Sequence, residues 1–380
     1  MNIAILIGSL CSGGAERVSV SLSRYLVDQG HRTTLITMHG SDRDFYVLDS
    51  RVTRVCLNLA GTNRGIHKIL ANINRVRALR HQLKTRRIDV VVGMMSSAAI
   101  YAILASIALP TRVIASERNF PGRKRIPAIW NILRRITYRF ADAHVVQTKE
   151  AADWVGKNTA SKNIHTIPNS VSWPIPSYEP VVHPEDVLPA ERSFVLAVGS
   201  QVHQKGFDLL IDAFARVAHK HWDWDLVILG LEEPEEVEND DTEQLKRAMY
   251  ETGIRDRVYL PGRVGNVGDW YERAEVFVLS SRYEGFPNVL LEAMASGCAC
   301  IAYDCDTGPR DVIANYLDGI LVPPENVLKL ADAICKLISD RSLRQKIGEK
   351  ASAVSDRYSE QEVFGLWCQV FHKVVRNGRG

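Results

Sequence analysis

Two glutamates eight positions apart, Glu284 and Glu292, lie in a stretch whose residue types could bind a phosphorylated sugar. An apolar run over 274–279 predicts a buried strand, and the turn over 285–287 leads from it into a helix. The first N–H groups of a helix are unpaired and attract anions such as phosphates. A carboxylate beside a phosphate would repel it unless it binds something else, such as sugar hydroxyls. The combination therefore suggests a nucleotide-sugar site.

The ten-residue string over 284–293, E-G-F-P-N-V-L-L-E-A, resembles the E-x7-E signature of retaining glycosyltransferases of family 4. This resemblance implies the GT-B fold, an α/β fold in which two Rossmann-like parallel-sheet domains face a central cleft. It extends over nearly the whole chain and is strongest from 194 to 323. It also implies a UDP-sugar donor, no cofactor and no metal.

The family's donor residues are carried over to the positions that match its motifs. Lys205 and Gly206 match the end of the phosphate loop G-R-L-x-x-x-K-G, but Ser200 stands where that loop has arginine. We expect Arg263 or Arg282 to replace this missing cation. The expected donor-binding residues are Gly199, Lys205, Arg263, Glu284, Gly285, Phe286, Pro287, Asn288, Val289, Leu290 and Glu292.

The implied chemistry is the departure of a nucleoside diphosphate, which enzymes assist with preorganised donors and cations. Lys205 and the amides near 288–290 would stabilise the leaving group, Glu284 would orient the transferred sugar, and Glu292 would bind the ribose. Lys205 and Glu284 are therefore the expected catalytic residues. The sequence offers no second carboxylate like the nucleophile of a retaining glycosidase. The resemblance implies attack on the same face through an ion-pair-like transition state.

The N-terminal half is expected to bind the acceptor. A first strand over 1–7 leads into G-G-A-E-R, which resembles the acceptor-side glycine loop of the family, and glycines let a backbone approach a ligand closely. The string S-E-R-N over 116–119 follows a predicted strand and resembles one in bacterial family 4 transferases that act on lipid-linked acceptors. Strand ends at the carboxyl edge of a parallel sheet point into the ligand crevice.

A predicted helix over 64–87 carries eight basic residues and no acidic one before Asp89. Similar lipid-linked-oligosaccharide transferases use a basic helix to hold the pyrophosphate of the acceptor. The expected acceptor-binding residues are Gly13, Gly14, Lys68, Arg75, Arg77, Glu117, Arg118 and Asn119.

Charge is distributed unevenly along the chain. Residues 1–175 hold 25 Lys and Arg against 10 Asp and Glu, whereas the remainder holds 22 against 34. Such asymmetry suggests that the N-terminal half meets an anionic partner. Cations alternate with apolar and aromatic residues over 123–139, a pattern typical of a helix on an anionic membrane surface. No recognised nucleic-acid motif accompanies the pattern, so nucleic acid is not an expected partner.

A length of 380 residues predicts two domains. We expect an acceptor-binding domain over 1–172, a Pro-rich linker over 173–192, a nucleotide-sugar domain over 193–359 and a helix over 360–380 that packs back on the first domain. Seven scattered cysteines indicate reduced thiols in a cytosolic protein, and the N-terminus does not match a signal peptide. The apolar run over 90–109 is interpreted as a strand and a helix rather than a membrane span.

The expected function is transfer of a hexose or N-acetylhexosamine, such as GalNAc, from a UDP-sugar to a polyprenyl-pyrophosphate-linked saccharide in bacterial glycan assembly. The enzyme would be cytoplasmic and peripheral on the inner face of the cytoplasmic membrane, an anionic surface. Two alternatives stay open. One is a UDP-sugar 2-epimerase of the same fold, and the other is a non-catalytic anionic-lipid-binding protein built on the basic half.

Overall fold

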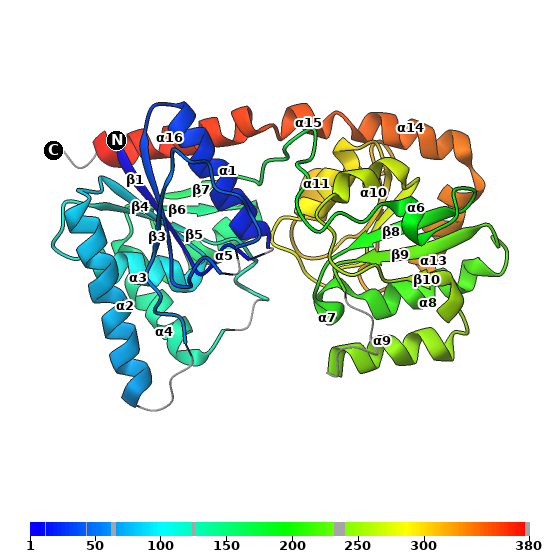
Figure 1. The fold of residues 1–380 in the computed structure, drawn as a ribbon, viewed down its shortest axis with the longest axis horizontal. Helices are drawn as coiled ribbons and strands as arrows, with labels where there is room; N and C mark the ends of the chain where they lie inside the picture. The colour runs from blue at the N-terminus through cyan, green and yellow to red at the C-terminus, as the bar shows by residue number, and fades with distance from the viewer. Residues whose placement is uncertain (12, 43, 62–65, 124–125, 232–239, 377–380) are drawn as a thin grey trace. The chain divides into compact units, whose positions relative to one another are not determined.

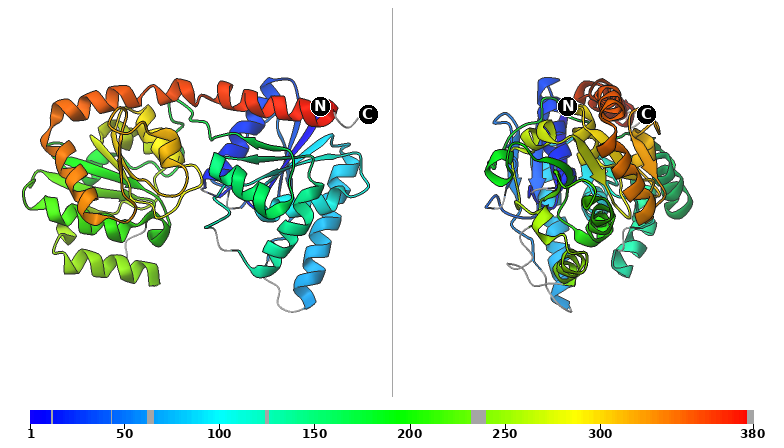
Figure 2. Two further views of the ribbon diagram at one scale, coloured as in Figure 1. Left: turned by 180° about the vertical axis from the view of Figure 1, so that it is seen from behind. Right: turned by 90° about the vertical axis from the view of Figure 1, so that its right-hand side faces the viewer.

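The computed structural model describes residues 1–380 except 12, 43, 62–65, 124–125, 232–239 and 377–380, and except the side chains of 66, 68, 240–242 and 244. The chain forms two compact units, residues 1–170 with 360–380 and residues 171–359. Each unit has a parallel β-sheet with helices packed on it (Figures 1 and 2). The predicted α/β class with two Rossmann-like parallel-sheet domains is confirmed.

The sheet of the first unit runs in the order β3-β2-β1-β4-β5-β6-β7. Its strands are β1 (Asn2–Ile7), β2 (Arg32–Thr37), β3 (Thr53–Cys56), β4 (Val90–Met94), β5 (Arg112–Ser116), β6 (Ala143–Val146) and β7 (Ile164–Thr166). The helices are α1 (Gly14–Asp28), α2 (Ile66–Thr85), α3 (Ser96–Ser106), α4 (Ala128–Thr137), η1 (Tyr138–Phe140), α5 (Lys149–Thr159) and α16 (Glu360–Arg376).

The sheet of the second unit runs in the order β10-β9-β8-β11-β12-β13. Its strands are β8 (Ser193–Val198), β9 (Trp224–Leu229), β10 (Val258–Tyr259), β11 (Val276–Leu279), β12 (Ala299–Tyr303) and β13 (Ile320–Val322). The helices are α6 (Pro184–Val187), α7 (Val202–Lys205), α8 (Phe207–Ala218), α9 (Asp240–Glu251), η2 (Arg255–Arg257), α10 (Val267–Arg273), α11 (Asn288–Ala295), α12 (Pro309–Val312), α13 (Val327–Ser339), α14 (Arg341–Ala351) and α15 (Val354–Arg357).

The strands of both sheets are nearly continuous apolar runs, because a strand that is covered on both faces buries every side chain. In the first unit one face of the sheet packs against α2, α3 and α4. In the second unit one face packs against α8, α9 and α13, and on the other α10 lies close enough for Trp270 to contact Phe194 and for Tyr271 to contact Phe277. Parallel strands buried in this way hold their carboxyl ends in a fixed register for the loops that follow.

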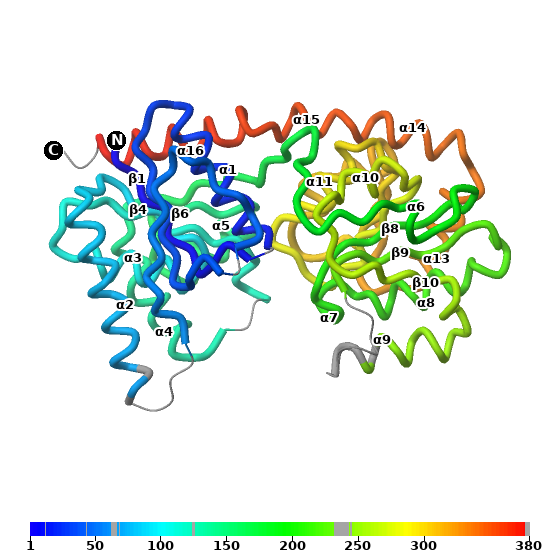
Figure 3. The backbone as a smooth tube through the Cα atoms, viewed as in Figure 1, coloured from blue at the N-terminus to red at the C-terminus, as the bar shows by residue number. Residues whose placement is uncertain are grey.

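The chain passes between the units at 170–171 and again at 359–360. The segment expected as a linker over 173–192 belongs to the second unit, because Asn266 and Trp270 both donate hydrogen bonds to the Val182 carbonyl. Helix α16 belongs to the first unit and lies beside α1, as the tube in Figure 3 shows. There Arg24 pairs with Glu360 at 2.6 Å.

The interpretation of 90–109 as a strand and a helix is confirmed by β4 and α3. Within the described part of the chain, no helix combines the length and apolar character needed to span a bilayer. Helix α9 begins at the end of the acidic segment over 232–243, whose first residues, 232–239, lie outside the described residues. An acidic helix N-terminus is favoured by the helix dipole.

Candidate active site

The centre of the second sheet brings the two expected catalytic side chains together. Strands β8 and β11 are neighbours, and the strand order reverses between them. Ligands of open parallel sheets bind at such a point, beyond the carboxyl ends of the strands. Lys205 ends the short helix after β8, Glu284 lies in the turn after β11, and Lys205 Nζ is 2.7 Å from Glu284 Oε1. Their side chains are only 16% and 7% exposed, so solvent screens the pair weakly.

Hydrogen bonds from two serines fix this ion pair. Ser281 Oγ donates to Glu284 Oε1 at 2.6 Å, and Ser280 Oγ donates to the Lys205 carbonyl at 2.8 Å. Both serines directly follow β11, so the strand that leads to Glu284 also anchors the loop of Lys205. The arrangement places a cation and an oriented carboxylate beside the same point on the sheet edge.

Gly206 and Gly199 are each required in this loop for a different structural reason. Gly206 has φ of +62°, and a Cβ there would lie 2.2 Å from the Ser280 carbonyl oxygen. Gly199 lies beside the lysine stem, where a Cβ would be 2.7 Å from Lys205 Cγ. Side chains at either position would therefore displace Lys205.

We expect Gly206→Ala to lower the melting temperature and to disrupt the Lys205–Glu284 pair. A left-handed conformation costs a non-glycine residue roughly 1–2 kcal/mol, and here the methyl group also meets backbone. Gly253→Ala is the matched control, because Gly253 has φ of +68° with no heavy atom within 4 Å of the added Cβ. Thermal unfolding should show a larger loss for Gly206→Ala. Equal losses in the two variants would contradict the contact with Ser280.

Arg282, one of two candidates to replace the arginine missing at Ser200, is held by carboxylates. Its Nη1 and Nη2 donate to the two oxygens of Asp208 at 2.9 and 2.6 Å, and its Nε donates to Glu325 at 3.2 Å. These hydrogen bonds raise the pKa of Arg282, with Asp208 as the main cause. These hydrogen bonds hold the Arg282 guanidinium against α8 and fix the loop after β11.

Arg263, the other candidate, is exposed in the loop that follows β10. The Gly230 N–H donates to the Gly262 carbonyl at 2.7 Å, which holds this loop against the end of β9. Arg263 therefore lies at the same carboxyl edge of the sheet as Lys205, and it is the better candidate for the second cation.

The remaining expected donor residues surround the start of α11. Phe286 is 6% exposed, and its ring centroid lies 5.6 Å from that of Tyr358. Glu292 is 3% exposed and accepts a hydrogen bond from Tyr271 at 3.2 Å, so it is a rigid acceptor. Leu290 is fully buried, so only its backbone is available to a ligand. Gly285 and Pro287 are buried in the turn, and Asn288 and Val289 are half-buried in the first turn of the helix.

In the first unit, Gly13 and Gly14 follow β1, beside the point where the strand order reverses between β1 and β4. Gly13 is the N-cap of α1 in an extended conformation, and a Cβ there would lie 2.3 Å from Glu16 Oε2. Gly14 is exposed. Burial raises the pKa of Glu16. A glycine turn that contacts a carboxylate suits an acceptor's hydroxyls better than its phosphates.

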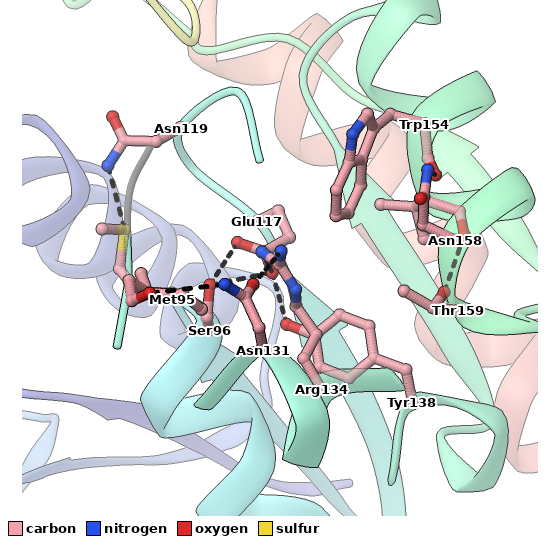
Figure 4. Close-up of polar contacts among 12 residues, drawn as sticks. Met95, Ser96, Glu117, Asn119, Asn131, Arg134, Tyr138, Trp154, Asn158 and Thr159 are labelled. Atoms are coloured by element: carbon pink, nitrogen blue, oxygen red, sulfur yellow. Dashed lines mark hydrogen bonds and ion pairs between the residues drawn. The ribbon is translucent and has the colours of Figure 1, made fainter. Parts of the chain in front are cut away.

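Glu117 lies at the end of β5 in a buried network (Figure 4). Ser96 Oγ donates to its two oxygens at 2.9 and 2.8 Å, Tyr138 donates at 2.5 Å, and Arg134 forms an ion pair at 3.6 Å. Burial raises the pKa of Glu117, and the hydrogen bond from Tyr138 and the charge of Arg134 oppose that rise. The network borders a cavity of about 240 Å³ between the β4–α3 turn and α4, and Asn119 also lines this cavity.

Arg118, the next residue after Glu117, is buried at 5% exposed. Its Nη2 donates to Asn169, but its Nε and Nη1 have no hydrogen-bond partner among the described residues. Burial lowers the pKa of Arg118 to about 9. Glu117 and Asn119 line the cavity, whereas Arg118, which lies between them in the sequence, does not.

The three basic residues expected on α2 differ in their surroundings. The guanidinium of Arg75 donates to the carbonyls of Leu59 and Gly61 at 2.8 and 2.9 Å and to Asn72 at 2.6 Å, so it ties α2 to the preceding loop. Arg77 is exposed, and no partner is found for it in the described part of the chain. The side chain of Lys68 lies outside the described residues. Arg77 is therefore the residue best placed to meet a phosphate.

Helices α2 and α4 both carry exposed apolar side chains. Both helices pack against α3, where Tyr101 bonds Asn72 of α2 and contacts the ring of Trp130 of α4. Figure 2 shows the two helices extending from the first unit. We call the exposed apolar side chains of α2, α4 and the adjoining η1 the apolar surface of α2 and α4: Ile69, Leu70, Ile73, Ile129, Ile132, Ile136 and Phe140, each at least 40% exposed. Arg135 and Arg139 are exposed beside it on α4 and η1.

Several residues that shape these sites were missed from the sequence. Ser281 orients Glu284, Asp208 holds Arg282, and Arg134 with Tyr138 holds Glu117. Among these residues, only Ser281 could have been found from its position in the sequence, because it closely follows the apolar run over 274–279. The other partners come from distant helices, and no local pattern marks them. Among the described residues, no group of three or more His, Cys, Asp or Glu side chains is arranged to hold a metal ion.

Two protein-family models match successive parts of the chain. Residues 12–172 match the family described as Glycosyltransferase Family 4, and residues 181–354 match the one described as Glycosyl transferases group 1. A curated relative is 27% identical over 380 residues, covering 98% of this chain and 99% of the relative. It is the GalNAc-α-(1→4)-GalNAc-α-(1→3)-diNAcBac-PP-undecaprenol α-1,4-N-acetyl-D-galactosaminyltransferase of Campylobacter jejuni.

Solved structures are similar over the full length. Sucrose-phosphate synthase from Thermosynechococcus elongatus has a TM-score of 0.83 at 18% identity, covering 99% of both chains. HepE from Anabaena, solved in complex with UDP, has a TM-score of 0.77 at 17% identity, covering 98% of this chain and 100% of that one. At these identities the likeness establishes the fold.

Proposed function

Because the chain belongs to the group 1 and family 4 glycosyltransferases of the GT-B fold, we propose that it moves a hexose or N-acetylhexosamine from a UDP-sugar to a polyprenyl-pyrophosphate-linked saccharide. Transfer would retain the anomeric configuration and require no metal. The second unit would bind the donor and the first unit the acceptor. The observation that carries this proposal is the buried pair of Lys205 and Glu284 at the point where the strand order reverses.

The proposed chemistry follows from the charges at this edge. Departure of UDP leaves a diphosphate anion, which Lys205, Arg263 and the N-terminal amides of α11 would stabilise. Glu284 would hold Lys205 in place and orient hydroxyls of the transferred sugar, while Glu292 would bind the ribose. The complex of HepE with UDP supports the nucleotide. The Campylobacter relative's PP-undecaprenol acceptor supports the lipid-linked saccharide and a role in bacterial glycan assembly.

The test is UDP release by the purified protein over a panel of UDP-hexoses and UDP-N-acetylhexosamines, with and without a short polyprenyl-pyrophosphate glycan. We expect release with one donor only when the lipid-linked glycan is present. A change in the UDP-sugar itself without any acceptor would instead indicate the epimerase. If no donor gives UDP release and the protein binds vesicles, the result would favour the non-catalytic lipid-binding protein.

We also propose that the apolar surface of α2 and α4 lies on the anionic inner face of the cytoplasmic membrane. Apolar side chains there would enter the headgroup region, and the exposed cations Arg135 and Arg139 would meet lipid phosphates. The stretch over 118–141 contains no acidic residue that would repel such a surface, and Glu117, which precedes it, is buried.

The variant Arg135→Glu with Arg139→Glu should bind anionic vesicles at least tenfold more weakly, because each basic residue near such a surface contributes about 1 kcal/mol. Flotation with phosphatidylglycerol vesicles measures this binding. Leu328→Asp is the control, because Leu328 is 61% exposed but lies in the second unit. Unchanged binding by the double variant would refute this membrane surface.

A further inference from the structure

The cavity of the first unit has a size that suits one part of a ligand. It measures about 240 Å³ and lies at the carboxyl ends of β4 and β5. Pockets for drug-sized ligands usually measure about 300–1,000 Å³. A space below that range suits a single sugar ring or one substituent of it rather than a nucleotide or a lipid. Met95, at its edge, has a φ of +75°, a strained value that clusters at ligand sites.

The charges that border this cavity are balanced. The carboxylate of Glu117 accepts hydrogen bonds from Ser96 and Tyr138. It also forms an ion pair with Arg134, whose side chain is 4% exposed. One buried negative charge thus meets one buried positive charge. A phosphate would be repelled by Glu117, and an added cation would compete with Arg134. The cavity is therefore suited to a neutral ligand.

The walls combine apolar surface with a few polar groups. Ile126, Trp130 and two prolines supply the apolar part, and Ser97 and Asn119 supply polar side chains. Each buried hydroxyl of an ordinary hexose would need its own partner, and an unpaired one is costly. An acetamido group instead presents one methyl, one N–H and one carbonyl.

We propose that this cavity takes the terminal N-acetyl sugar of the acceptor glycan, with its acetamido group against Trp130 and Asn119. This inference rests on the proposed function and deepens it, because it names the acceptor sugar that the first unit selects. The acetamido methyl packs on the apolar wall, and its carbonyl accepts from the side-chain N–H of Asn119, which lines the cavity. Trp130 is then the residue that determines acceptor specificity, and Glu117 is a positioning residue that holds Arg134.

Saturation-transfer NMR tests this selection without donor or turnover. The probes are methyl N-acetyl-α-galactosaminide and methyl α-galactoside, each mixed with the intact protein. We expect transfer to the acetyl methyl protons and an apparent affinity about tenfold or more above that of the galactoside, the range that small apolar groups contribute to specificity. Equal signals from both sugars, or no signal from the N-acetyl sugar, would overturn the inference.

Trp130→Leu should remove this preference, and Trp222→Leu is the matched control, because Trp222 is 75% exposed in the second unit. Asn119→Leu provides a second variant, since Asn119 is only partly buried and its loss should leave the fold intact. Both pocket variants should lose the N-acetyl signal while the control keeps it. A full signal in Asn119→Leu and Trp130→Leu would contradict the assignment. Because no UDP-sugar is present, failure of transfer and failure of this inference give separate results.

Discussion

Glu284→Gln should reduce glycosyl transfer by about 10²-fold or more while the protein stays folded. The substitution keeps the size of the side chain but removes the charge that holds Lys205 Nζ at 2.7 Å. Lys205 would then be free to move, and a displacement of about 1 Å from the productive geometry can cost about 10²-fold in rate. The amide would also accept more weakly from a sugar hydroxyl than the carboxylate does.

Steady-state UDP release with saturating donor and acceptor measures this loss as a fall in kcat. Glu272→Gln is the matched control, because Glu272 is exposed on α10 in the same unit. It should leave both the rate and the melting temperature unchanged. A rate for Glu284→Gln within a few-fold of the parent would exclude Glu284 from the reaction.

Lys205→Met should lower kcat by about 10²–10³-fold, the cost of losing one preorganised group that stabilises a developing anion. It should also weaken UDP binding, because the diphosphate loses a cation. Stability should fall as well, since Glu284 is 7% exposed and would keep a charge without its partner.

The double variant Lys205→Met with Glu284→Gln separates these two effects. Removing the unpaired carboxylate should restore part of the melting temperature that Lys205→Met loses, but it should restore no activity. Isothermal titration with UDP and thermal unfolding provide the two readouts. Lys346→Met, at an exposed position of the same unit, is the control. Recovery of turnover in the double variant would contradict a direct role for Lys205.

Much of the fold could be predicted because buried parallel strands are continuous apolar runs. The apolar run over 274–279 predicts the strand that is β11 in the structure. The string that follows the run predicts that Glu284 lies in the turn after this strand. The glycine at 206 was likewise predictable by resemblance, and its φ of +62° gives the physical reason. These features are local, so a sequence pattern can carry them.

Features that depend on tertiary contacts were beyond the sequence. The sequence predicts that Arg75 binds the acceptor and that Arg282 is one of two candidates for the missing cation. It does not predict that the Leu59 and Gly61 carbonyls hold Arg75 or that Asp208 holds Arg282. The sequence predicts that Glu117 binds the acceptor substrate. It does not predict the donors that surround this carboxylate in the structure, which come from α3, α4 and η1. Periodicity shows which face of a helix is apolar, but not which distant residue meets a cation on it.

The most direct test of the central claim is mass spectrometry of the lipid-linked glycan after incubation with the protein and its UDP-sugar. We predict that the glycan grows by the mass of one transferred sugar with the parent protein and stays unchanged with Glu284→Gln. Release of UDP with no change in the glycan, or equal growth with Glu284→Gln, would contradict transfer by the Lys205–Glu284 site.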